Sequence, residues 1–456
     1  MKPPPPAGFS GEERPSRELE QLARRVSILE LVDAAITRPG RAGTARTDCP
    51  HCVAVSGCVV SDSQWRCDHC ESQGGPIEFV MARRRLPWSR AIPELFKHAQ
   101  LADAASAWSD RVTEAQIACD VARKWFRAQF AASAAARAYW ESRGFSMASA
   151  EREDIGYAPQ GTAPLLEGLH ATRVSNRAAL DAGLLKLGVG TSLQARFRDR
   201  VMFPISDSDD MHAVAFGGRA IEAADATPTA RRRPKYLNSP ETILWSKGSS
   251  LFGYGSARDA IQRARTAVLV EGYLHRLRVL EAGVPHVVAS CGTSLTSGQA
   301  EQIATAVRGP GERKSGTVIV LYDEGAGAQA LHAAALLGTI GLCALIGRLP
   351  PGSDDPDSFG RRACCDALRY VIESAVPPWV AAYAAEAGDD EAVLPLPRRA
   401  QVLRHLCEMA SAHPSSRARR ALGEFVSSRF GVPQSMVEEQ LARVAVPTGK
   451  HAPAPR

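Results

Sequence analysis

Four short apolar runs, separated by segments with helical spacing, constrain the fold of this chain more than any other feature. Strand-like runs that alternate with helices predict a parallel, doubly wound sheet of the α/β class. The whole series lies between Thr266 and Asp357. The predicted strands cover residues 267–270, 286–290, 317–322 and 342–346, and the predicted helices cover residues 274–281, 297–307 and 326–337.

Carboxylates follow three of these four predicted strands. Glu271 comes directly after the first strand, Asp323 after the third, and Asp355 and Asp357 lie beyond the fourth. The active edge of a doubly wound sheet lies at the carboxyl ends of its strands, so these acids are expected to converge. Converging carboxylates bind hard divalent cations, and Mg²⁺ needs only one or two of them together with phosphates. Helix caps or solvated loop residues are the alternative interpretation of such acids.

Length and composition indicate a soluble globular protein with several domains. A chain of 456 residues is too long for one hydrophobic core, and about three domains are expected. The apolar content of 45% and the charged content of 23% are typical of globular proteins. The net charge of +6 is compatible with nucleic-acid binding but is not diagnostic of it.

No targeting or membrane segment is expected. The Pro-rich, charged start through Arg17 lacks the apolar core of a signal peptide and predicts a disordered tail. The longest apolar stretch, residues 330–346, is shorter than the about 20 residues that a bilayer needs, and Gly341 divides it. Four of the eleven cysteines form two C-x-x-C pairs. Most of the others are single and lie in apolar surroundings, which favours a reducing cytoplasm.

The two C-x-x-C pairs, at residues 49–52 and 67–70, predict a zinc ribbon. Fourteen residues separate the inner cysteines, a spacing that brings four thiolates within tetrahedral reach. Redox motifs or free thiols are the alternative. Cys58, between the pairs, is expected in the core. The predicted zinc ligands are Cys49, Cys52, Cys67 and Cys70.

Around these pairs the chain predicts a small α/β module. A helix is expected over residues 26–36, a hairpin over residues 58–66 and a helix over residues 76–83. Trp65 is a candidate for stacking on a base, and the arginines of residues 83–85 for following a phosphate backbone. For the arginines, a solvated helix end is the alternative interpretation.

A basic stretch occupies the middle of the chain. Arginines alternate over residues 196–200, directly before an apolar strand at residues 201–205, and alternation predicts that they share one face. Gly217 and Gly218 allow the backbone to approach a ligand closely. Such a surface suits a polyanion, although for any single arginine a solvated position is the alternative.

Several motifs in this order resemble DnaG-type DNA primases of bacteria and phages. The sequence Cys-Pro-x-Cys, a hairpin, Trp-x-Cys-x-x-Cys and Gly-Gly resembles their zinc-binding domain, in the all-cysteine form of phage primases. The motifs Arg-Phe-Arg-x-Arg, Phe-Gly-Gly-Arg and Lys-Tyr-Leu-Asn-Ser resemble their template- and nucleotide-binding motifs. Glu-Gly-Tyr and Gly-Thr-Ser-Leu-Thr resemble the toprim fold. The resemblance covers about residues 23–440.

This resemblance implies a site for each substrate. The implied template and nucleotide contacts are Arg196, Arg198, Arg200, Arg219, Lys235, Tyr236, Asn238 and Lys247. The implied catalytic residues and ligands of Mg²⁺ or Mn²⁺ are Glu271, Asp323, Asp355 and Asp357, with Glu271 as the candidate acceptor of the hydroxyl proton.

Two positions depart from the family pattern. The family carries Asp four residues after its glutamate, where this chain has His275. The family also carries Asp-x-Asp before Ala-Gly, whereas the loop from Asp323 is one residue shorter and places Glu324 next. Glu324 replaces the missing Asp only if the shortened loop turns it round, because adjacent residues of an extended segment diverge. Imidazole favours softer metals than Mg²⁺, so one metal is expected rather than two.

The expected organisation is multi-domain α+β. A zinc ribbon precedes a mixed α/β polymerase core with a parallel-sheet toprim domain, and a helical bundle follows. Helices of that bundle are expected over residues 363–375, 377–385, 396–412, 415–430 and 433–445. The expected parts are a disordered tail (1–22), zinc-binding domain (23–97), helical linker (98–138), basic core subdomain (139–260), toprim domain (261–357), helical bundle (358–445) and disordered tail (446–456).

The leading functional hypothesis is a DNA primase that joins ribonucleoside triphosphates into a short RNA primer on single-stranded DNA. Structural Zn²⁺ and catalytic Mg²⁺ or Mn²⁺ are the implied cofactors, and a replicative helicase is a candidate partner. The alternative is a catalytically weakened relative, from a phage, plasmid or mobile element, that only binds nucleic acid. A toprim nuclease or topoisomerase fits the acids but not the zinc ribbon or the Lys-Tyr-Leu-Asn-Ser motif.

Overall fold

The structure is a computed structural model, and the chain divides into two compact units, Met1–Ser250 and Leu251–Arg456. The two predicted disordered tails lie outside the residues that it describes. It describes residues 25–32, 38–39, 43–50, 56–68, 72–84, 88–100, 102–221, 234–292, 294–308, 316–387, 401–404, 406 and 416–444.

The first unit opens with a five-stranded antiparallel sheet in chain order. The predicted hairpin is confirmed, since Val59 pairs with Arg66. The predicted helix over residues 26–36 is wrong in length, because the backbone becomes extended again at Val32. The elements are α2 (Ile28–Leu31), β1 (Arg38–Pro39), β2 (Ala45–Thr47), β3 (Cys58–Val60), β4 (Trp65–Cys67), β5 (Gln73–Gly74), α3 (Pro76–Arg84) and α4 (Trp88–His98).

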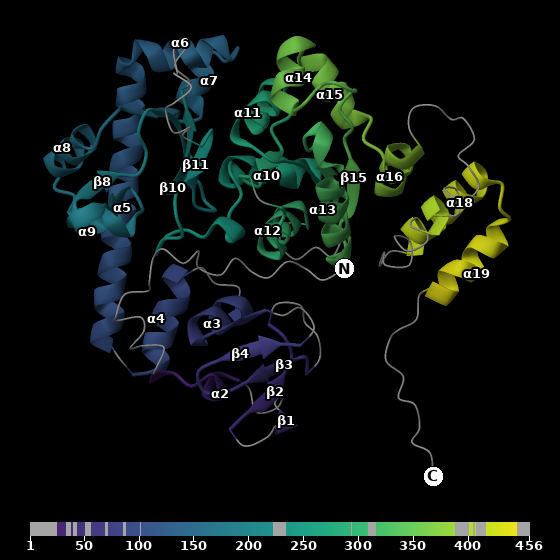
Figure 1. Ribbon diagram of the computed structural model, residues 1–456, viewed down its shortest axis with the longest axis horizontal. Coiled ribbons are helices and arrows are strands. Elements are labelled where there is room, and N and C mark those ends of the chain that lie inside the picture. Colours follow the sequence, from purple (N-terminus) through teal and green to yellow (C-terminus); the bar gives the residue numbers. More distant parts are fainter. Residues whose placement is uncertain are drawn as a thin grey trace. The chain divides into compact units, whose positions relative to one another are not determined.

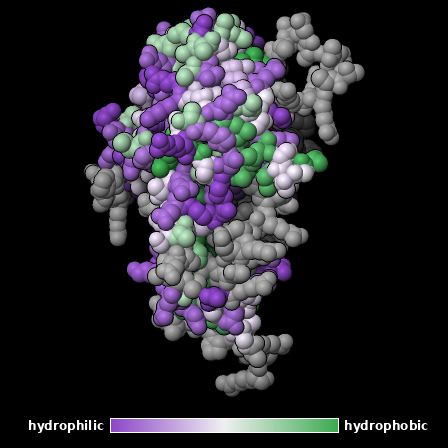
Figure 2. Space-filling model, turned by 90° about the vertical axis from the view of Figure 1, so that its left-hand side faces the viewer, coloured by the Kyte–Doolittle hydropathy of each residue, from purple (hydrophilic) through white to green (hydrophobic). Residues whose placement is uncertain are grey.

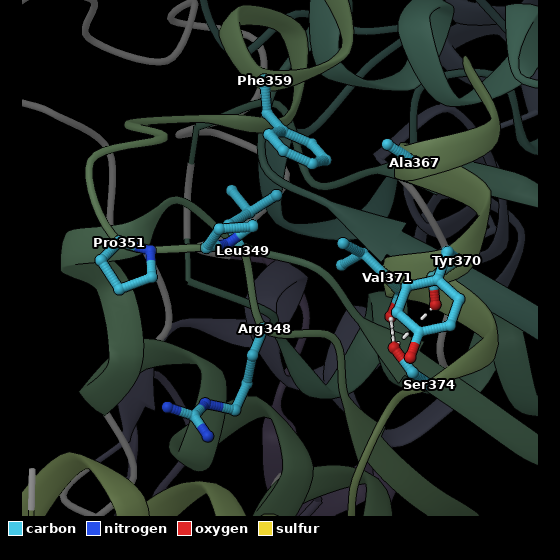
Figure 3. Close-up of a pocket in the computed structure, with 9 residues that line it drawn as sticks. Arg348, Leu349, Pro351, Phe359, Ala367, Tyr370, Val371 and Ser374 are labelled. Atoms are coloured by element: carbon cyan, nitrogen blue, oxygen red, sulfur yellow. Dashed lines mark hydrogen bonds between the residues drawn. The ribbon is translucent and has the colours of Figure 1, made fainter. Parts of the chain in front are cut away.

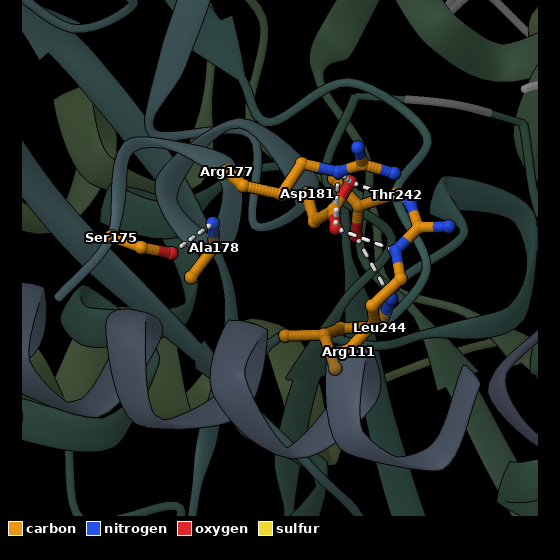
Figure 4. Close-up of polar contacts among 7 residues, drawn as sticks. All are labelled: Arg111, Ser175, Arg177, Ala178, Asp181, Thr242 and Leu244. Atoms are coloured by element: carbon orange, nitrogen blue, oxygen red, sulfur yellow. Dashed lines mark hydrogen bonds and ion pairs between the residues drawn. The ribbon is translucent and has the colours of Figure 1, made fainter. Parts of the chain in front are cut away.

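The long helix α5 (Ala102–Ala132) lies within the predicted helical linker of residues 98–138 and packs into a core of the first unit. Its apolar face, with Ala118, Ala122 and Phe126, lies in a core shared with the neighbouring strands, along which it runs in Figure 1. Arg111 binds Asp181 at the end of α9 (Asn176–Asp181), 2.9 Å away, as Figure 4 shows. The helices between are α6 (Ala134–Ser142), α7 (Met147–Arg152) and α8 (Ala163–Ala171).

A four-stranded antiparallel sheet carries the basic stretch of the first unit. Its order is β11 (Tyr236–Asn238), β10 (Ala213–Ala220), β9 (Arg200–Ser206) and β6 (Gly156–Ala158). A separate hairpin of β7 (Leu185–Leu187) and β8 (Leu193–Ala195) leads into it.

The second unit contains the predicted parallel sheet. The strand order is β13-β12-β14-β15, and each neighbouring pair is parallel. Side chains of both faces are buried, since Leu269 packs with the helices of one face while Val270 is buried on the other, as a doubly wound sheet requires. The elements are α10 (Tyr254–Ala264), β12 (Thr266–Val270), α11 (Tyr273–Glu281), β13 (Val287–Ala289), α12 (Ser297–Arg308), β14 (Thr317–Val320), α13 (Gly327–Thr339) and β15 (Cys343–Ile346).

Helices follow the sheet to the end of the described chain. The predicted helix over residues 363–375 is divided differently, because α14 ends at Arg362 and α15 begins at Cys365. Most of the predicted helix over residues 396–412 lies outside the described residues. The observed helices are α14 (Pro356–Arg362), α15 (Cys365–Glu373), α16 (Pro378–Ala387), α18 (Ser416–Phe430) and α19 (Gln434–Val444).

Hydrophilic residues predominate on the face shown in Figure 2, with smaller apolar areas between them. Large exposed apolar side chains, such as Leu187, Met211 and Met436, lie far apart in the sequence. Among the described helices, none is long and apolar enough to cross a bilayer.

Candidate functional site

Glu271 and Asp323 meet at the carboxyl edge of the parallel sheet. They follow β12 and β14, which are adjacent strands with Leu269 in register with Val320. The backbone N–H of Asp323 donates to Glu271 Oε1 at 3.1 Å. Two acids predicted from strand ends 52 positions apart therefore lie side by side.

His275 lies between two of the predicted acids. Its Nδ1 is 3.4 Å from Asp323 Oδ1, and its Nε2 is 3.8 Å from Asp355 Oδ1. The His275 side chain is only 12% exposed, whereas the side chains of Asp323 and Asp355 are 39% and 25% exposed. The residue that departs from the family pattern thus joins the segment after β14 to the segment after β15.

Asp355 has a structural contact as well. It is the N-cap of α14, and its Oδ1 accepts a hydrogen bond from the backbone N–H of Ser358 at 2.7 Å. An N-cap of this kind satisfies one of the amides that a helix start leaves unpaired. The cap fixes the Asp355 carboxylate near His275.

Asp357 forms a buried ion pair with Arg278 of α11. Arg278 donates from Nε to Asp357 Oδ1 at 3.2 Å, and its Nη2 lies 3.1 Å from the same oxygen. The two side chains are 5% and 1% exposed. Gly360 makes the approach possible, because a Cβ there would lie 2.6 Å from Arg278 Cγ. This ion pair gives Asp357 a structural contact, and its role beside the other acids stays a prediction.

Glu324 turns toward the segment that precedes Asp355. Its Oε1 accepts from the N–H of Gly352 at 3.0 Å, and its Oε2 accepts from those of Ser353 at 3.1 Å and Asp354 at 3.3 Å. The hydrogen bonds from Gly352 and then Asp354 lower the pKa of the Glu324 carboxyl. Glu324 therefore binds backbone amides, and the shortened loop does not bring it beside Asp323 as a substitute ligand.

These contacts decide how a divalent cation fits the acids. Within the described ranges, no three His, Cys, Asp or Glu side chains lie close enough together to hold a metal ion. A preformed all-protein cage is therefore not what this edge offers. Mg²⁺ usually binds one or two carboxylates plus substrate phosphates, and the adjacent Glu271 and Asp323 fit that need.

Arg200, one of the predicted template contacts, is buried within the first unit. Its Nη1 donates to the carbonyl of Gly218 at 3.1 Å, and its Nη2 to that of Pro234 at 2.9 Å. A Cβ at Gly218 would lie 2.9 Å from Arg200 Cδ. The missing side chain at Gly218 therefore leaves room for the Arg200 side chain and not for a ligand. The predicted shared face is wrong because Asp199, with φ of +54°, turns the chain before β9 begins.

Arg219 is likewise buried, at 7% exposure, between two tyrosines. Its Nε donates to the hydroxyl of Tyr139, and its Nη1 to that of Tyr236 at 2.6 Å. The guanidinium also lies 5.0 Å from the centre of the Tyr236 ring, within cation–π range. Arg219 thus links Tyr139 of α6 to the sheet that carries Tyr236.

The remaining predicted contacts differ in their accessibility. Arg196 donates from Nε to the carbonyl of Asn238 at 3.1 Å, so both are engaged within the unit. Lys247 is half-buried. Arg198 and Lys235 are exposed, and they are the two predicted cations best placed to meet a polyanion.

The zinc-ribbon region is described in part. Cys49 and Cys67 are buried in one small core together with Cys58, which confirms Cys58 as a core residue. Cys52 and Cys70 lie outside the described residues. Trp65 is 2% exposed and packs edge-on against Phe79, so it offers no free face for stacking on a base.

An apolar pocket of about 480 Å³ lies beside α14 and α15, and its lining includes Arg348, Leu349, Phe359 and Tyr370 (Figure 3). Apolar pockets are the usual first candidates for ligand sites. None of the four predicted acids is among its described lining residues. The carboxyl edge of the sheet is therefore the stronger candidate for chemistry.

Two arginines of α11 were not identified from the sequence as part of the site. Arg278 binds Asp357, and Arg276, 1% exposed, donates from Nε to the carbonyl of Val287 at 3.2 Å. The signal was an Arg-x-Arg pair beside the apolar residues of a helix that packs on the sheet. Arginines in such a helix require buried acceptors.

Comparisons with known proteins agree with this architecture. Residues 125–258 match the family model described as DNA primase catalytic core, N-terminal domain. The DNA primase of Aquifex aeolicus is 30% identical over 369 residues, which cover 79% of this chain and 69% of that protein.

Two solved structures are similar over most of their length. The crystal structure of the Aquifex aeolicus primase zinc-binding and RNA polymerase domains has a TM-score of 0.60 at 25% identity, covering 93% of this chain and 99% of that chain. A DnaG primase catalytic domain bound to single-stranded DNA has a TM-score of 0.58 at 26% identity, covering 72% of this chain and 99% of that chain.

Proposed function

The chain belongs to the DnaG-type DNA primase family, whose enzymes synthesise RNA primers on DNA templates, and we propose that its polymerisation site is the sheet edge bearing Glu271 and Asp323. The observation that carries this assignment is the hydrogen bond from the Asp323 amide to the Glu271 carboxylate. It brings together two acids of separate motifs where a doubly wound sheet binds its ligands.

The chemistry assigned to this edge is nucleotidyl transfer. A bound Mg²⁺ or Mn²⁺ would offset charge on the attacking and leaving oxygens of the transferred phosphoryl group. Glu271 and Asp323 are the residues that would hold it, and Asp355 lies next to them through His275. Glu271, oriented by the Asp323 amide, is the group we assign to accept the proton of the primer hydroxyl. Asp357 is assigned a structural role.

The proposed substrates are a single-stranded DNA template and ribonucleoside triphosphates. Arg198 and Lys235 are the exposed cations assigned to the template, because each phosphate contact releases condensed counterions. A replicative helicase is a further partner proposed for testing, and the proposed location is the cytoplasm. The finer domain bounds, including a zinc-binding domain at residues 23–97 and a toprim domain at residues 261–357, are also proposals.

Structural zinc is assigned to the N-terminal module. Cys49 and Cys67 supply one cysteine from each C-x-x-C pair, and both are buried in the same core. Four thiolates are the usual ligands of a closed structural zinc site. The complete proposed set is Cys49, Cys52, Cys67 and Cys70.

Primer synthesis is tested with the full chain, single-stranded templates of varied sequence, labelled ribonucleotides, and Mg²⁺ or Mn²⁺. We expect short labelled oligoribonucleotides from the wild type and none from Glu271→Gln. Folding of both proteins is checked by circular dichroism. A folded wild-type protein that makes no product on any template with either metal contradicts the assignment.

A second candidate function is nucleic-acid binding without efficient synthesis, and the position of His275 between Asp323 and Asp355 favours it. His275→Asp combined with an Asp inserted after Glu324 tests it. A gain of synthesis over an inactive wild type indicates a decayed site, and an already active wild type rejects this candidate.

A further inference from the structure

We infer that Glu324 is a positioning residue, whose carboxylate holds the backbone of residues 352–354 and thereby keeps Asp355 beside Asp323 and His275. This inference deepens the proposed function and rests on it, because it concerns the same sheet edge. It assigns a role to the acid that follows Asp323 in a loop one residue shorter than that of the family pattern.

The contacts between Glu324 and residues 352–354 run in both directions. The carboxylate accepts three backbone N–H groups, at 3.0, 3.1 and 3.3 Å. In return, the backbone N–H of Glu324 donates to the carbonyl of Asp354 at 2.8 Å. Four hydrogen bonds thus join one residue after β14 to three consecutive residues after β15.

The backbone of residues 352–354 is shaped to bind a carboxylate. Gly352 has φ of +75° and Asp354 has φ of +61°, both in the left-handed region. Consecutive N–H groups in such turns point into one concavity and form an anion-binding nest. A left-handed conformation at a residue other than glycine is costly and persists only where surrounding contacts hold it. Glu324 provides those contacts for Asp354.

The hydrogen bonds between Glu324 and residues 352–354 lie next to two acids of the proposed site. Glu324 follows Asp323 directly, and Asp354 precedes Asp355 directly. Asp355 in turn lies 3.8 Å from His275, which lies 3.4 Å from Asp323. The hydrogen bonds of Glu324 therefore set how far the Asp323 and Asp355 segments stand apart.

A direct metal-ligand role is the competing explanation for an acid at this position. Both Glu324 oxygens already accept backbone hydrogen bonds, and a ligand role does not account for three amides directed at one carboxylate. The two explanations differ in what Gln does at this position. Its amide oxygen still accepts a hydrogen bond, whereas a neutral amide is a poor ligand for Mn²⁺ compared with a carboxylate.

The experiment compares Glu324→Ala, Glu324→Gln and the wild type in the full chain, with Glu373→Gln, an exposed glutamate of α15, as the matched control. Amide hydrogen exchange of residues 352–354 measures how well Glu324 protects these backbone amides, and electron paramagnetic resonance of Mn²⁺ measures the affinity for the cation. Neither measurement needs primer synthesis, which is assayed in parallel.

We expect Glu324→Ala to speed exchange of the three amides by about tenfold or more, since several hydrogen bonds are lost. The Mn²⁺ affinity of Glu324→Ala is expected to fall several-fold. Glu324→Gln should have an exchange rate and a Mn²⁺ affinity between those of Glu324→Ala and the wild type, and Glu373→Gln should match the wild type in both. If Glu324→Ala fails to fold, the test is whether Glu324→Gln has faster amide exchange and weaker Mn²⁺ binding than the wild type.

Unchanged exchange in both Glu324 variants overturns the inference. So does a loss of Mn²⁺ binding in Glu324→Gln as large as in Glu324→Ala with exchange unchanged, which is the signature of a direct ligand. The two proposals can fail separately. If the wild type makes no primers while Glu324→Ala still shows faster exchange and weaker Mn²⁺ binding, the proposed function is refuted, and the positioning role of Glu324 is still supported.

Discussion

Arg278 contacts one carboxylate oxygen of Asp357 through two nitrogens: Nε donates a hydrogen bond at 3.2 Å, and Nη2 forms an ion pair at 3.1 Å. Both side chains are almost fully buried. Breaking a buried ion pair on one side leaves an uncompensated charge, at a cost of about 3–5 kcal/mol. We therefore expect Arg278→Ala to lower the free energy of unfolding by that amount, measured by urea denaturation. Exposed Arg361→Ala is the control, with an effect of about 0.5 kcal/mol or less.

The same pair offers a second check within this prediction. Replacing both partners, as in Arg278→Met with Asp357→Leu, removes both charges together and is expected to recover much of the loss. If Arg278→Ala unfolds at the wild-type urea concentration, the pair is not structural, and Asp357 returns to the list of possible metal ligands.

His275→Asp is expected to change which cation the sheet edge prefers. Aspartate adds an oxygen ligand where imidazole now contacts Asp323 and Asp355, and Mg²⁺ selects oxygen ligands whereas imidazole suits softer metals. The Mg²⁺ affinity should rise several-fold relative to that for Mn²⁺, as measured by titration calorimetry with each ion. His275→Asn removes the imidazole without adding charge, and equal Mg²⁺ affinities of the Asn and Asp variants would contradict the prediction.

Arg198→Ala is expected to weaken single-stranded DNA binding without loss of stability. Arg198 is exposed, and a cation that neutralises one phosphate of a single strand contributes about 0.7 to the slope of log affinity against log salt. Binding measured by fluorescence anisotropy over a range of salt concentrations should show that reduction. The control is Lys186→Ala, which removes another exposed cation of the first unit. If both variants reduce the slope equally, Arg198 does not make a specific contact with the template.

The parallel sheet could be predicted from the sequence, whereas the surroundings of its acids could not. Apolar runs separated by helical spacing fix strand identity, and the parallel topology then places Glu271 beside Asp323. The partners of Asp357 and Glu324 depend on side-chain directions in loops and on a buried arginine of α11. Local sequence does not encode those directions.

The basic stretch shows the same limit. Alternating arginines predict one solvent-facing surface only if the segment is a continuous strand, and the left-handed turn at Asp199 interrupts it. Arg200 and Arg219 then point inward, where carbonyls and tyrosine hydroxyls accept their hydrogen bonds. The sequence identified which residues are basic, and only tertiary packing decides which of them remain exposed.

The turn at Asp199 also carries the last prediction, because Tyr157 donates its hydroxyl to Asp199 Oδ1 at 3.0 Å. Burial first, and then the hydrogen bond and the charge of Asp199, raise the pKa of Tyr157 to about 12. A pKa raised above its unfolded value of 10.0 gives stability that is fully present below pH 10 and is lost as the pH rises toward about 12. Tyr157→Phe should therefore be less stable than the wild type at neutral pH, with a difference that shrinks over this alkaline window. Urea unfolding at a series of pH values measures it, with exposed Tyr370→Phe as the control, and a difference independent of pH would refute the assignment.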